Sequence, residues 1–338
     1  MPRRHEYHPL RVADVIEETA DTRSFVLEIP AALAECFAYV AGQYCTFRAT
    51  IGGEPIVRSY SMSSSPQTCD PFTVTVKRVP GGKMSNWMND TLSPGDAIDV
   101  TSPAGRFVLR ASEDPVVAFA GGSGITPVLS IIKTALATTA REIALVYANR
   151  GSGSVIFADA LERLRAGSGG RLAVHQHLDS ENGYLDAAAC AVLVGERVQA
   201  DFYVCGPTPY MEVVRTGLDQ RGVDPGRLFI ERFELPDAAA VASEASETES
   251  IVIRLEGRTH RVGYESGDTI LDAARRAGLK PPFNCQAGNC ATCMAHLDEG
   301  RATMRVNNAL GADEVEGGWI LTCQAIPTSR EVVVNYDD

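Results

Sequence analysis

The sequence predicts a multidomain fold, with an amino-terminal antiparallel β-barrel, a central α/β domain on a parallel sheet and a small carboxyl-terminal domain. The chain has 338 residues, more than one ordinary domain holds. Short strands and turns fill its first third, and strands alternate with helices in its middle third. A segment of small and acidic residues then precedes four cysteines in a distinctive spacing. We therefore expect domains at residues 1–111, 112–235 and 250–338, with a linker at 236–249.

The chain is acidic. Its formal net charge is −12, of which residues 236–338, with 16 acidic and 9 basic side chains, carry −7. This disfavours nucleic acid as a partner, and the acidic end serves either solubility or docking to a basic patch on a redox partner. The nine cysteines are an odd number, no apolar signal segment begins the chain, and no run of eighteen apolar residues occurs. We expect a monomer in a reducing cytoplasmic setting, without disulfides or a membrane span.

Alternation of apolar and polar side chains identifies the strands of the first domain. It is clearest at residues 72–77, where it is typical of a strand with one buried face. Glycine and proline pairs close the turns. We expect a small barrel with strands at residues 10–16, 24–29, 44–49, 56–62, 72–78 and 97–102.

Two segments of this barrel carry groups that suit a planar anionic cofactor. The segment Arg58-Ser59-Tyr60-Ser61 offers a cation, an aromatic face and hydroxyls on one strand, which together can stack and hydrogen-bond. After Arg78, a glycine turn at residues 81–82 leads into a helix whose first amides suit an anion. Each segment alone is equally typical of a structural strand, or of a turn before a short helix.

The central third has the pattern of a parallel sheet. Residues 115–120 form an apolar strand, a glycine turn occupies 121–125, and Thr126 and Pro127 start a helix as its N-cap and first residue. Glycines before a helix suit a phosphate, although the spacing is not G-x-G-x-x-G. Further strands are expected at residues 143–147, 172–177, 201–205 and 228–231, and helices near 157–166 and 210–221. This alternation predicts a sheet covered on both faces, with ligands at the carboxyl ends of its strands.

Four cysteines of the last third have the ligand spacing of a plant-type [2Fe–2S] cluster. Cys285, Cys290 and Cys293 follow C-x4-C-x2-C, and Cys323 comes later. Gly288 can adopt positive φ and leaves the loop free to curl round the cluster. The alternatives are a structural zinc site, which usually pairs two short knuckles, and reduced structural cysteines. A hairpin at residues 251–263, a helix at 269–277 and strands at 319–323 and 331–335 complete this domain.

Together these motifs resemble the ferredoxin–NADP reductase superfamily and, in their order, the reductase components of multicomponent oxygenases. The chain is similar in particular to the reductases of 3-ketosteroid-9α-monooxygenase and of phenylacetyl-CoA oxygenase. The resemblance implies an FAD-binding barrel, a nicotinamide-dinucleotide domain and a β-grasp ferredoxin-type domain. It also implies an oxidoreductase that passes electrons from NADH or NADPH through FAD and a [2Fe–2S] cluster singly to a terminal oxygenase, which would be the protein partner.

The resemblance further implies which residues bind each group. The flavin would lie against Arg58, Ser59, Tyr60 and Ser61, with Ser61 near flavin N5. The rest of FAD would lie on Val76, Lys77, Arg78, Gly82, Lys83, Met84 and Ser85. The nicotinamide coenzyme would lie on Gly121, Gly122, Gly124, Thr126, Pro127, Asn149, Arg150, Cys205, Gly206, Pro207, Glu231 and Phe233. Of these, Cys205 and Phe233 would gate the nicotinamide.

The coenzyme and the overall role keep alternatives. Arg150 could meet the 2′-phosphate of NADPH, lie on the adenine or point into solvent, and neither Asn149 nor Arg150 is an acid that could hold a ribose hydroxyl. The other roles are a tethered ferredoxin-type electron-transfer module, a stand-alone flavin reductase and the reductase arm of a nitric-oxide-detoxifying enzyme. The nucleotide motifs disfavour the first of these, and the cysteine loop disfavours the other two.

Overall fold

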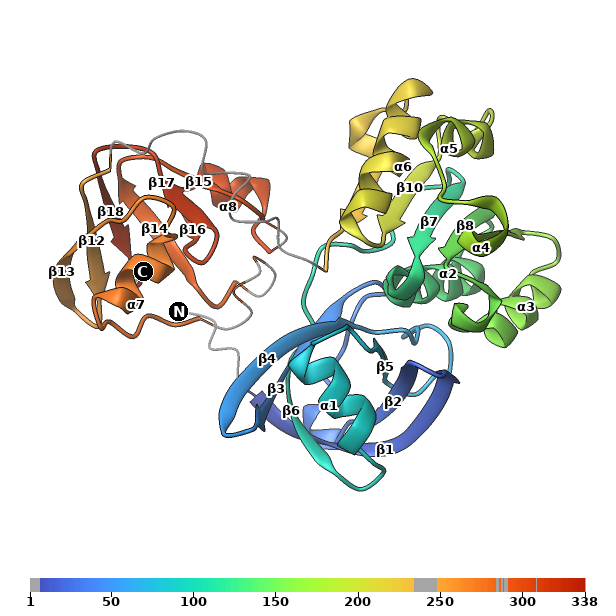
Figure 1. The fold of residues 1–338 in the computed structure, drawn as a ribbon, viewed down its shortest axis with the longest axis horizontal. Coiled ribbons are helices and arrows are strands. Elements are labelled where there is room, and N and C mark those ends of the chain that lie inside the picture. The colour runs from blue at the N-terminus through green and yellow to red at the C-terminus, as the bar shows by residue number, and fades with distance from the viewer. Residues whose placement is uncertain are drawn as a thin grey trace. The chain divides into compact units, whose positions relative to one another are not determined.

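The computed structural model describes residues 7–233, 248–283, 286, 288, 291–307 and 309–337 (Figure 1). The chain divides into two compact units, one of residues 7–233 and the other containing the described residues from 248 onward.

Six antiparallel strands form the predicted barrel. Their order is β4-β3-β6-β1-β2-β5, and an isolated bridge from Met62, just after β4, to Val74 in β5 brings the two edges together. Alternate side chains point inward along the strands, so Phe25, Phe47 and Val74 are fully buried. The strands are β1 (Tyr7–Thr19), β2 (Thr22–Glu28), β3 (Tyr44–Ile51), β4 (Glu54–Ser61), β5 (Thr73–Lys77) and β6 (Ala97–Thr101).

A single α-helix lies across the barrel (Figure 1). This helix, α1 (Lys83–Thr91), packs against β3, β4 and β5. Met84 and Met88 are four residues apart and therefore on one face, and both are buried there. Their burial fixes the amino-terminal turn of α1 close to the end of β5.

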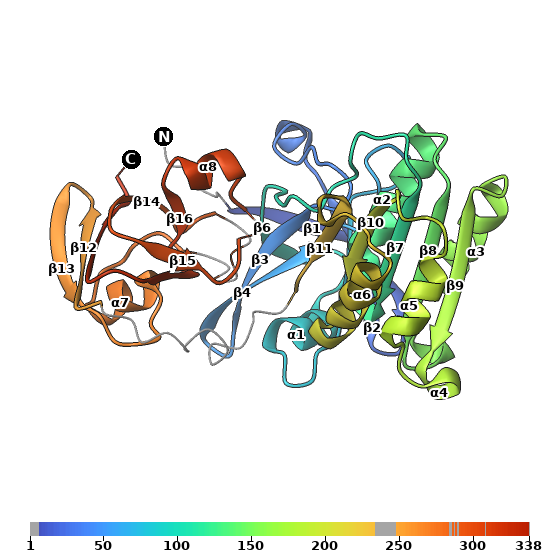
Figure 2. The same ribbon diagram turned by 90° about the horizontal axis from the view of Figure 1, so that it is seen from above.

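The predicted parallel sheet follows the barrel, in the order β11-β10-β7-β8-β9. Its two faces bury separate apolar clusters, one under α2 and α3 and the other under α5 and α6, and Figures 1 and 2 show these helix pairs on opposite sides of the sheet. The strands are β7 (Val116–Gly121), β8 (Ile143–Asn149), β9 (Leu172–Leu178), β10 (Asp201–Cys205) and β11 (Leu228–Glu231). The helices are α2 (Ile125–Thr138), α3 (Ala158–Gly167), α4 (Asp179–Asn182), α5 (Ala187–Val194) and α6 (Thr208–Gln220).

The predicted start of α2 is wrong. A 3-10 turn over Gly122–Gly124 runs directly into the helix, so Gly124 is the N-cap and Ile125 the first helical residue. Thr126 lies inside the helix, where its hydroxyl donates to the Ser123 carbonyl at 3.0 Å. Pro127 follows one residue later, and its missing N–H is still tolerated in the first turn of a helix.

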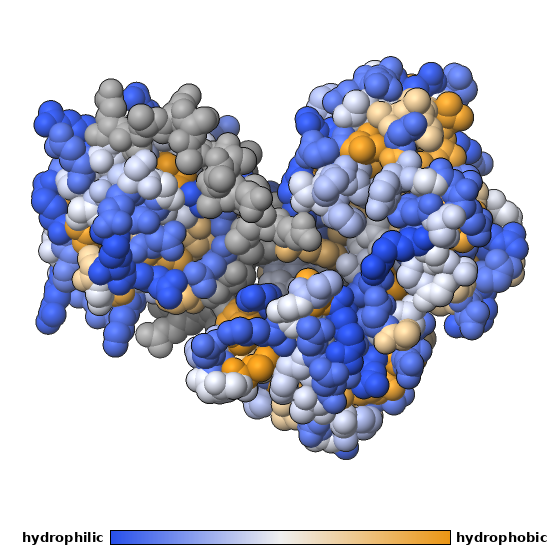
Figure 3. Space-filling model, viewed as in Figure 1, coloured by the Kyte–Doolittle hydropathy of each residue, from blue (hydrophilic) through white to orange (hydrophobic). Residues whose placement is uncertain are grey.

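The sequence reasoning also missed α5. This helix is apolar all round, with the sequence AAACAVLV, and so it has no polar face that would mark a helical period. Cys190 and Val194 are buried against the sheet, whereas Val192 is 79% exposed. Apolar side chains consequently gather on the surface over α5 and α6 (Figure 3).

Polar contacts join the barrel to the α/β sheet inside the first unit. The Ser130 hydroxyl of α2 donates to the Ser64 carbonyl at 2.5 Å, and the hydroxyls of Thr134 and Ser65 pair at 2.7 Å. At the edge of this contact Lys133 forms an ion pair with Asp70, at 2.7 Å. The segment after β4 is thus tied to α2, and we name these three contacts the barrel junction.

The second unit is a mixed five-stranded sheet with one helix packed against it. The sheet order is β13-β12-β18-β14-β16, and β15 pairs with β17 separately. Ile270, Ala273 and Ala274 of α7 pack into the same buried cluster as Ile251 and Val332 of the sheet. The elements are β12 (Ser250–Leu255), β13 (Arg258–Gly263), α7 (Ile270–Arg276), β14 (Met294–Glu299), β15 (Ala302–Met304), α8 (Ala312–Glu316), β16 (Trp319–Leu321), β17 (Ala325–Pro327) and β18 (Glu331–Asn335).

In this unit the predicted hairpin, the helix and both predicted strands, β16 and β18, are present, whereas β14, β15, α8 and β17 were not predicted. Across the described parts of both units, every helix is too short or too polar to cross a membrane.

Candidate functional site

The strand β4 presents the first predicted segment. Side chains alternate along a strand, so Arg58 and Tyr60 share one face and Ser59 and Ser61 the other. Arg58 is exposed, and its guanidinium donates to the Val57 carbonyl at 2.7 Å. The Tyr60 ring meets Phe47 edge to face at 5.6 Å, and burial raises the pKa of its hydroxyl. A rigid aromatic surface and an accessible cation therefore lie side by side on this strand.

The first turn of α1 has no side-chain cap. Gly82 is the N-cap and provides no side chain to bond the first amides. A Cβ at Gly82 would lie 2.7 Å from the Ser85 hydroxyl oxygen, and that oxygen accepts the Val79 amide at 3.1 Å. The turn is therefore closed tightly by Ser85, while the helix amino terminus favours negative charge.

Close packing of backbone brings together the two glycine motifs of the α/β domain. A Cβ at Gly124 would lie 2.1 Å from the Cys205 carbonyl oxygen, and one at Gly206 would lie 3.1 Å from the Gly121 Cα. The strands β7 and β10 are paired in parallel. Their carboxyl ends, each followed by one of the two motifs, therefore lie at the same edge of the sheet. This edge of the sheet is where such folds bind ligands.

Two polar groups at this edge are buried without a hydrogen bond of good geometry among the described residues. They are the Tyr210 hydroxyl and the amide of Asn149, which is 4% exposed and has the Tyr147 hydroxyl as its polar neighbour. The Tyr210 ring lies across both motifs, since Cβ atoms at Gly121 and Gly206 would approach it to 3.0 and 2.8 Å. Buried polar groups are normally paired, so these two groups indicate a ligand site. Tyr210 was not predicted, and an aromatic residue shortly after Cys205-Gly206-Pro207 was its only sequence signal.

Cys205 and Glu231 lie opposite each other at the ends of β10 and β11. Burial raises the pKa of the Cys205 thiol, and the neighbouring Glu231 adds to the effect. Burial also raises the pKa of Glu231 to about 8. At pH 7 the thiol is therefore protonated, and the carboxyl is mainly so. Phe233, two residues further on, is 43% exposed.

Arg150 has an acidic neighbour that the sequence did not indicate. Its guanidinium lies 3.8 Å from the Asp21 carboxylate, which also lies 3.6 Å from Lys77. Asp21 comes from the turn between β1 and β2. Although partial burial acts to raise the pKa of Asp21, bonds from Thr19 and Thr22 and the two cations lower it overall. Arg150 is mostly exposed and is therefore only weakly held.

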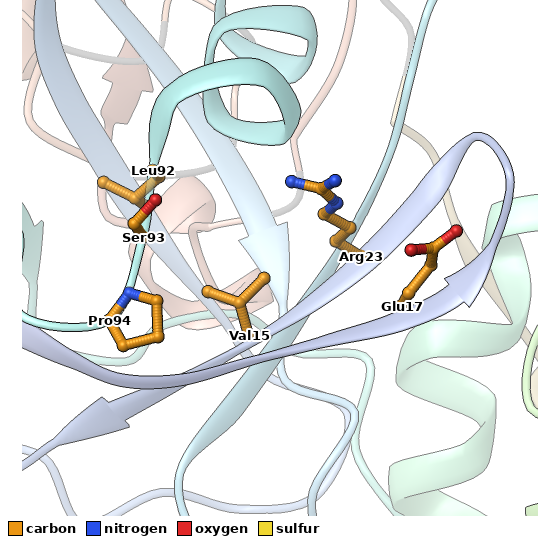
Figure 4. A pocket seen from close by; sticks show the side chains of 6 residues that line it. All are labelled: Val15, Glu17, Arg23, Leu92, Ser93 and Pro94. Carbon is orange, nitrogen blue, oxygen red and sulfur yellow. The ribbon is translucent and has the colours of Figure 1, made fainter.

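A shallow pocket lies elsewhere on the barrel, between β1, β2 and the segment after α1 (Figure 4). Arg23 at its side donates to the Asn89 carbonyl at 2.7 Å. None of the predicted site residues lines it; its lining is Val15, Glu17, Arg23, Leu92, Ser93 and Pro94.

In the second unit, Cys293 and Cys323 are brought together. Both are buried, and the Cys323 amide donates to the Cys293 sulfur at 3.5 Å. The hydrogen bond with Cys293, and then burial, raise the pKa of the Cys323 thiol, so two thiolates here require a positive group between them. Cys285 and Cys290 lie outside the described residues.

The described part of the cysteine loop fits a [2Fe–2S] cluster. The predicted positive φ of Gly288 is confirmed at 73°, and a Cβ there would lie 2.8 Å from the Val306 carbonyl oxygen. Gln286 and Ala291 also have positive φ, 53° each. Such turns curl the loop tightly, as wrapping thiolates round a compact group requires.

Comparisons with known proteins agree with this arrangement. The chain matches an oxidoreductase FAD-binding domain over residues 9–109, an oxidoreductase NAD-binding domain over 119–216 and a 2Fe-2S iron-sulfur cluster binding domain over 253–328. It is 35% identical to the ferredoxin reductase component of 3-ketosteroid-9-alpha-monooxygenase from Rhodococcus rhodochrous, across 97% of this chain and 96% of that one.

Two further relatives also match over nearly the whole length of both chains. A component of the 1,2-phenylacetyl-CoA epoxidase from Escherichia coli is 32% identical over 98% of both chains. The structure of phthalate dioxygenase reductase matches with a TM-score of 0.62 and 25% identity, over 99% of both chains. With its FAD-binding, NAD-binding and [2Fe–2S] domains in this order, the chain belongs to the family of oxygenase reductase components.

Proposed function

We propose that this protein takes electrons from NADH or NADPH at the edge of the parallel sheet and delivers them singly to a terminal oxygenase. The observation that supports this most directly is the convergence of Gly124, Cys205, Asn149 and Glu231 at that edge, within the unit that also holds the Arg58–Tyr60 strand. FAD, when bound, accepts a hydride and releases electrons one at a time, and a [2Fe–2S] cluster carries one electron at a time.

The residues of β4 and α1 would hold FAD. The Tyr60 ring, already fixed against Phe47, would stack on the flavin, and Arg58 would supply positive charge. The amides at the start of α1, from Lys83 to Ser85, would hold the diphosphate. Ser61, which is buried, would hydrogen-bond near flavin N5.

The residues of the sheet edge would hold the nicotinamide coenzyme. Gly121 to Gly124 would admit its diphosphate to the backbone amides, and the Asn149 amide and Tyr210 hydroxyl would gain the partners they lack. Cys205 and Glu231 would line the nicotinamide ring. Because both are mainly protonated at pH 7, they would place little negative charge beside it. Phe233, which is exposed after β11, would cover the flavin ring until the coenzyme enters.

The geometry favours NADH over NADPH. If Arg150 read a 2′-phosphate, the Asp21 carboxylate 3.8 Å away would repel the same phosphate. A ribose hydroxyl would meet no such repulsion and could donate to this carboxylate.

We also propose the domain boundaries expected from the sequence, at residues 1–111, 112–235 and 250–338, with 236–249 as a linker. Each of the three family matches falls within one of these ranges.

Purified protein provides the test. We expect flavin absorption together with a [2Fe–2S] spectrum, about two irons and two acid-labile sulfides per chain, and reduction of both centres by NADH. Bound zinc without sulfide would refute the iron–sulfur assignment. Flavin reduction without cluster reduction would favour a stand-alone flavin reductase instead.

A further inference from the structure

Gln324 directly follows the last cysteine, and its polar side chain is buried. It is 3% exposed. Its amide nitrogen donates to the Gln286 carbonyl at 2.8 Å and lies 3.8 Å from the Cys323 sulfur. One side-chain NH2 group therefore contacts both the segment after Cys285 and the sulfur of the last cysteine.

Gln286, the residue held by this amide, is in an uncommon conformation. Its φ is 53°, a value that residues other than glycine rarely adopt without local support. A second bond holds the same residue from outside, because Arg275 donates to the Gln286 side-chain oxygen at 3.1 Å. Arg275 is itself fixed by stacking over Phe283 at 4.5 Å. The turn at Gln286 is thus tied on two sides, by Gln324 within the fold and by Arg275 at the surface.

Packing alone does not account for an amide at position 324. The Gln324 Cγ would lie 3.1 Å from a Cβ at Gly288, so the stem of the side chain fills the space beside the loop. An apolar side chain of the same length would fill it equally well. The amide oxygen is buried and has no hydrogen-bond partner among the described residues, which opposes folding. The useful part of this side chain is therefore its N–H groups.

We propose that Gln324 is a positioning residue of the iron–sulfur centre that holds the cysteine loop and raises the reduction potential of the cluster. The inference rests on the [2Fe–2S] cluster of the proposed function. Reduction adds negative charge to the cluster and its ligand sulfurs, and an N–H group aimed at a ligand sulfur stabilises the reduced state more than the oxidised state. Gln324 is placed to supply that N–H group to Cys323.

The test compares full-length holoprotein variants by redox titration followed by electron paramagnetic resonance. Gln324→Met keeps the length of the side chain and removes the donor. We expect the one-electron reduction equilibrium of its cluster to shift about three- to tenfold toward the oxidised form, where tenfold corresponds to about 59 mV. Gln286→Met is the matched control, because it removes the bond from Arg275 without changing the net charge and leaves the backbone carbonyl of residue 286 and the contact with Cys323 in place. We expect it to lose cluster faster than the native protein while keeping the native potential.

The outcomes separate the inference from the proposed function. A native protein without a [2Fe–2S] cluster would refute the proposed function. If the native protein holds a cluster, and the cluster potential is the same in Gln324→Met as in Gln286→Met, only the role of Gln324 is refuted. If Gln324→Met does not retain a cluster, Gln324→Leu takes its place in the titration.

If neither variant retains a cluster, the native protein decides the matter. It would be made by cell-free synthesis with glutamine labelled with 15N only in the side chain, and the reduced cluster would be examined by pulsed electron paramagnetic resonance. A 15N coupling would support the contact between Gln324 and the ligand sulfur. Its absence would overturn the inference.

Discussion

Replacing Gly124 with alanine would place a methyl group inside the contact between the two nucleotide motifs. The new Cβ would lie 2.1 Å from the Cys205 carbonyl oxygen and 2.4 Å from its carbonyl carbon. These are backbone atoms, so no flexible side chain can move aside, and the turn at Gly124 and the end of β10 must move apart by about 1 Å. Gly124 has φ −60° and ψ −12°, which alanine adopts freely. The whole effect of the substitution is therefore steric.

Overpacking of this kind costs about 1–3 kcal/mol, and a clash with backbone belongs at the upper end. We expect the free energy of unfolding of residues 7–233 to fall by about 3 kcal/mol, which lowers Tm by roughly 6–12 °C for a unit of this size. Release of FAD fluorescence on heating measures the shift. Because the displaced backbone borders the proposed coenzyme site, KM for NADH in ferricyanide reduction should rise as well.

Two other glycines provide controls for this substitution. An alanine at Gly153 meets nothing within 4 Å and should leave Tm unchanged. An alanine at Gly122 also meets nothing but must adopt φ 53°, which costs about 1–2 kcal/mol. The steric argument would be refuted if Gly124→Ala were no less stable than Gly153→Ala, or destabilised only as much as Gly122→Ala.

Three further predictions concern the coenzyme, the cluster and pH. Arg150→Ala should change KM for NADH and NADPH about equally. A selective rise in KM for NADPH would assign Arg150 to the 2′-phosphate and contradict the preference for NADH, because a charge-assisted bond to that phosphate would contribute about 1.5–3 kcal/mol to binding. Cys290→Ser replaces a soft ligand with a hard one, so it should lose the cluster and cytochrome c reduction but keep FAD and ferricyanide reduction, whereas loss of ferricyanide reduction with FAD bound would contradict the modular scheme. The pKa of Glu231 is raised from 4.5 to about 8, so the folded state keeps a proton that the unfolded state loses, and stability declines as pH rises from about 4.5 to 8. Denaturant unfolding should show Glu231→Gln gaining stability over the native protein by about 2.5 kcal/mol more at pH 8.5 than at pH 6, and equal gains would place Glu231 in a more polar environment.

The sequence was sufficient wherever local pattern determines structure. Alternation at residues 72–77 correctly predicted β5, and the glycine turn after the apolar run correctly predicted β7 followed by a helix. The helix start was misplaced because threonine and proline are a common helix-start pair, whereas Gly122–Gly124 already forms a helical turn. The helix α5 was missed for a different reason: it is apolar on every side, so its sequence shows no helical alternation of apolar and polar residues.

Long-range contacts could not be predicted from one sequence. Nothing near Gly124 in the chain indicates that its hydrogen atom faces the carbonyl of Cys205, 81 positions later. The pairing of Arg150 with Asp21 joins residues far apart in the chain, and it supplies an acid near the proposed ribose site that neither Asn149 nor Arg150 supplies. The role of Gln324 likewise could not be predicted, because it depends on the contacts of its amide with Gln286 and Cys323.

The barrel junction has a consequence for recombination with related reductases. A chimera that exchanges the barrel alone, with its crossover near residue 111, would take Ser65 and Asp70 from one parent and Thr134 and Lys133 from the other. It would therefore combine a hydroxyl pair and an ion pair whose members had not been matched to one another. A crossover between residues 234 and 247 would keep all three contacts of the junction within one parent. Homologues should therefore exchange their iron–sulfur domains more freely than their flavin domains, and a new coenzyme preference is better obtained by point substitution than by domain exchange.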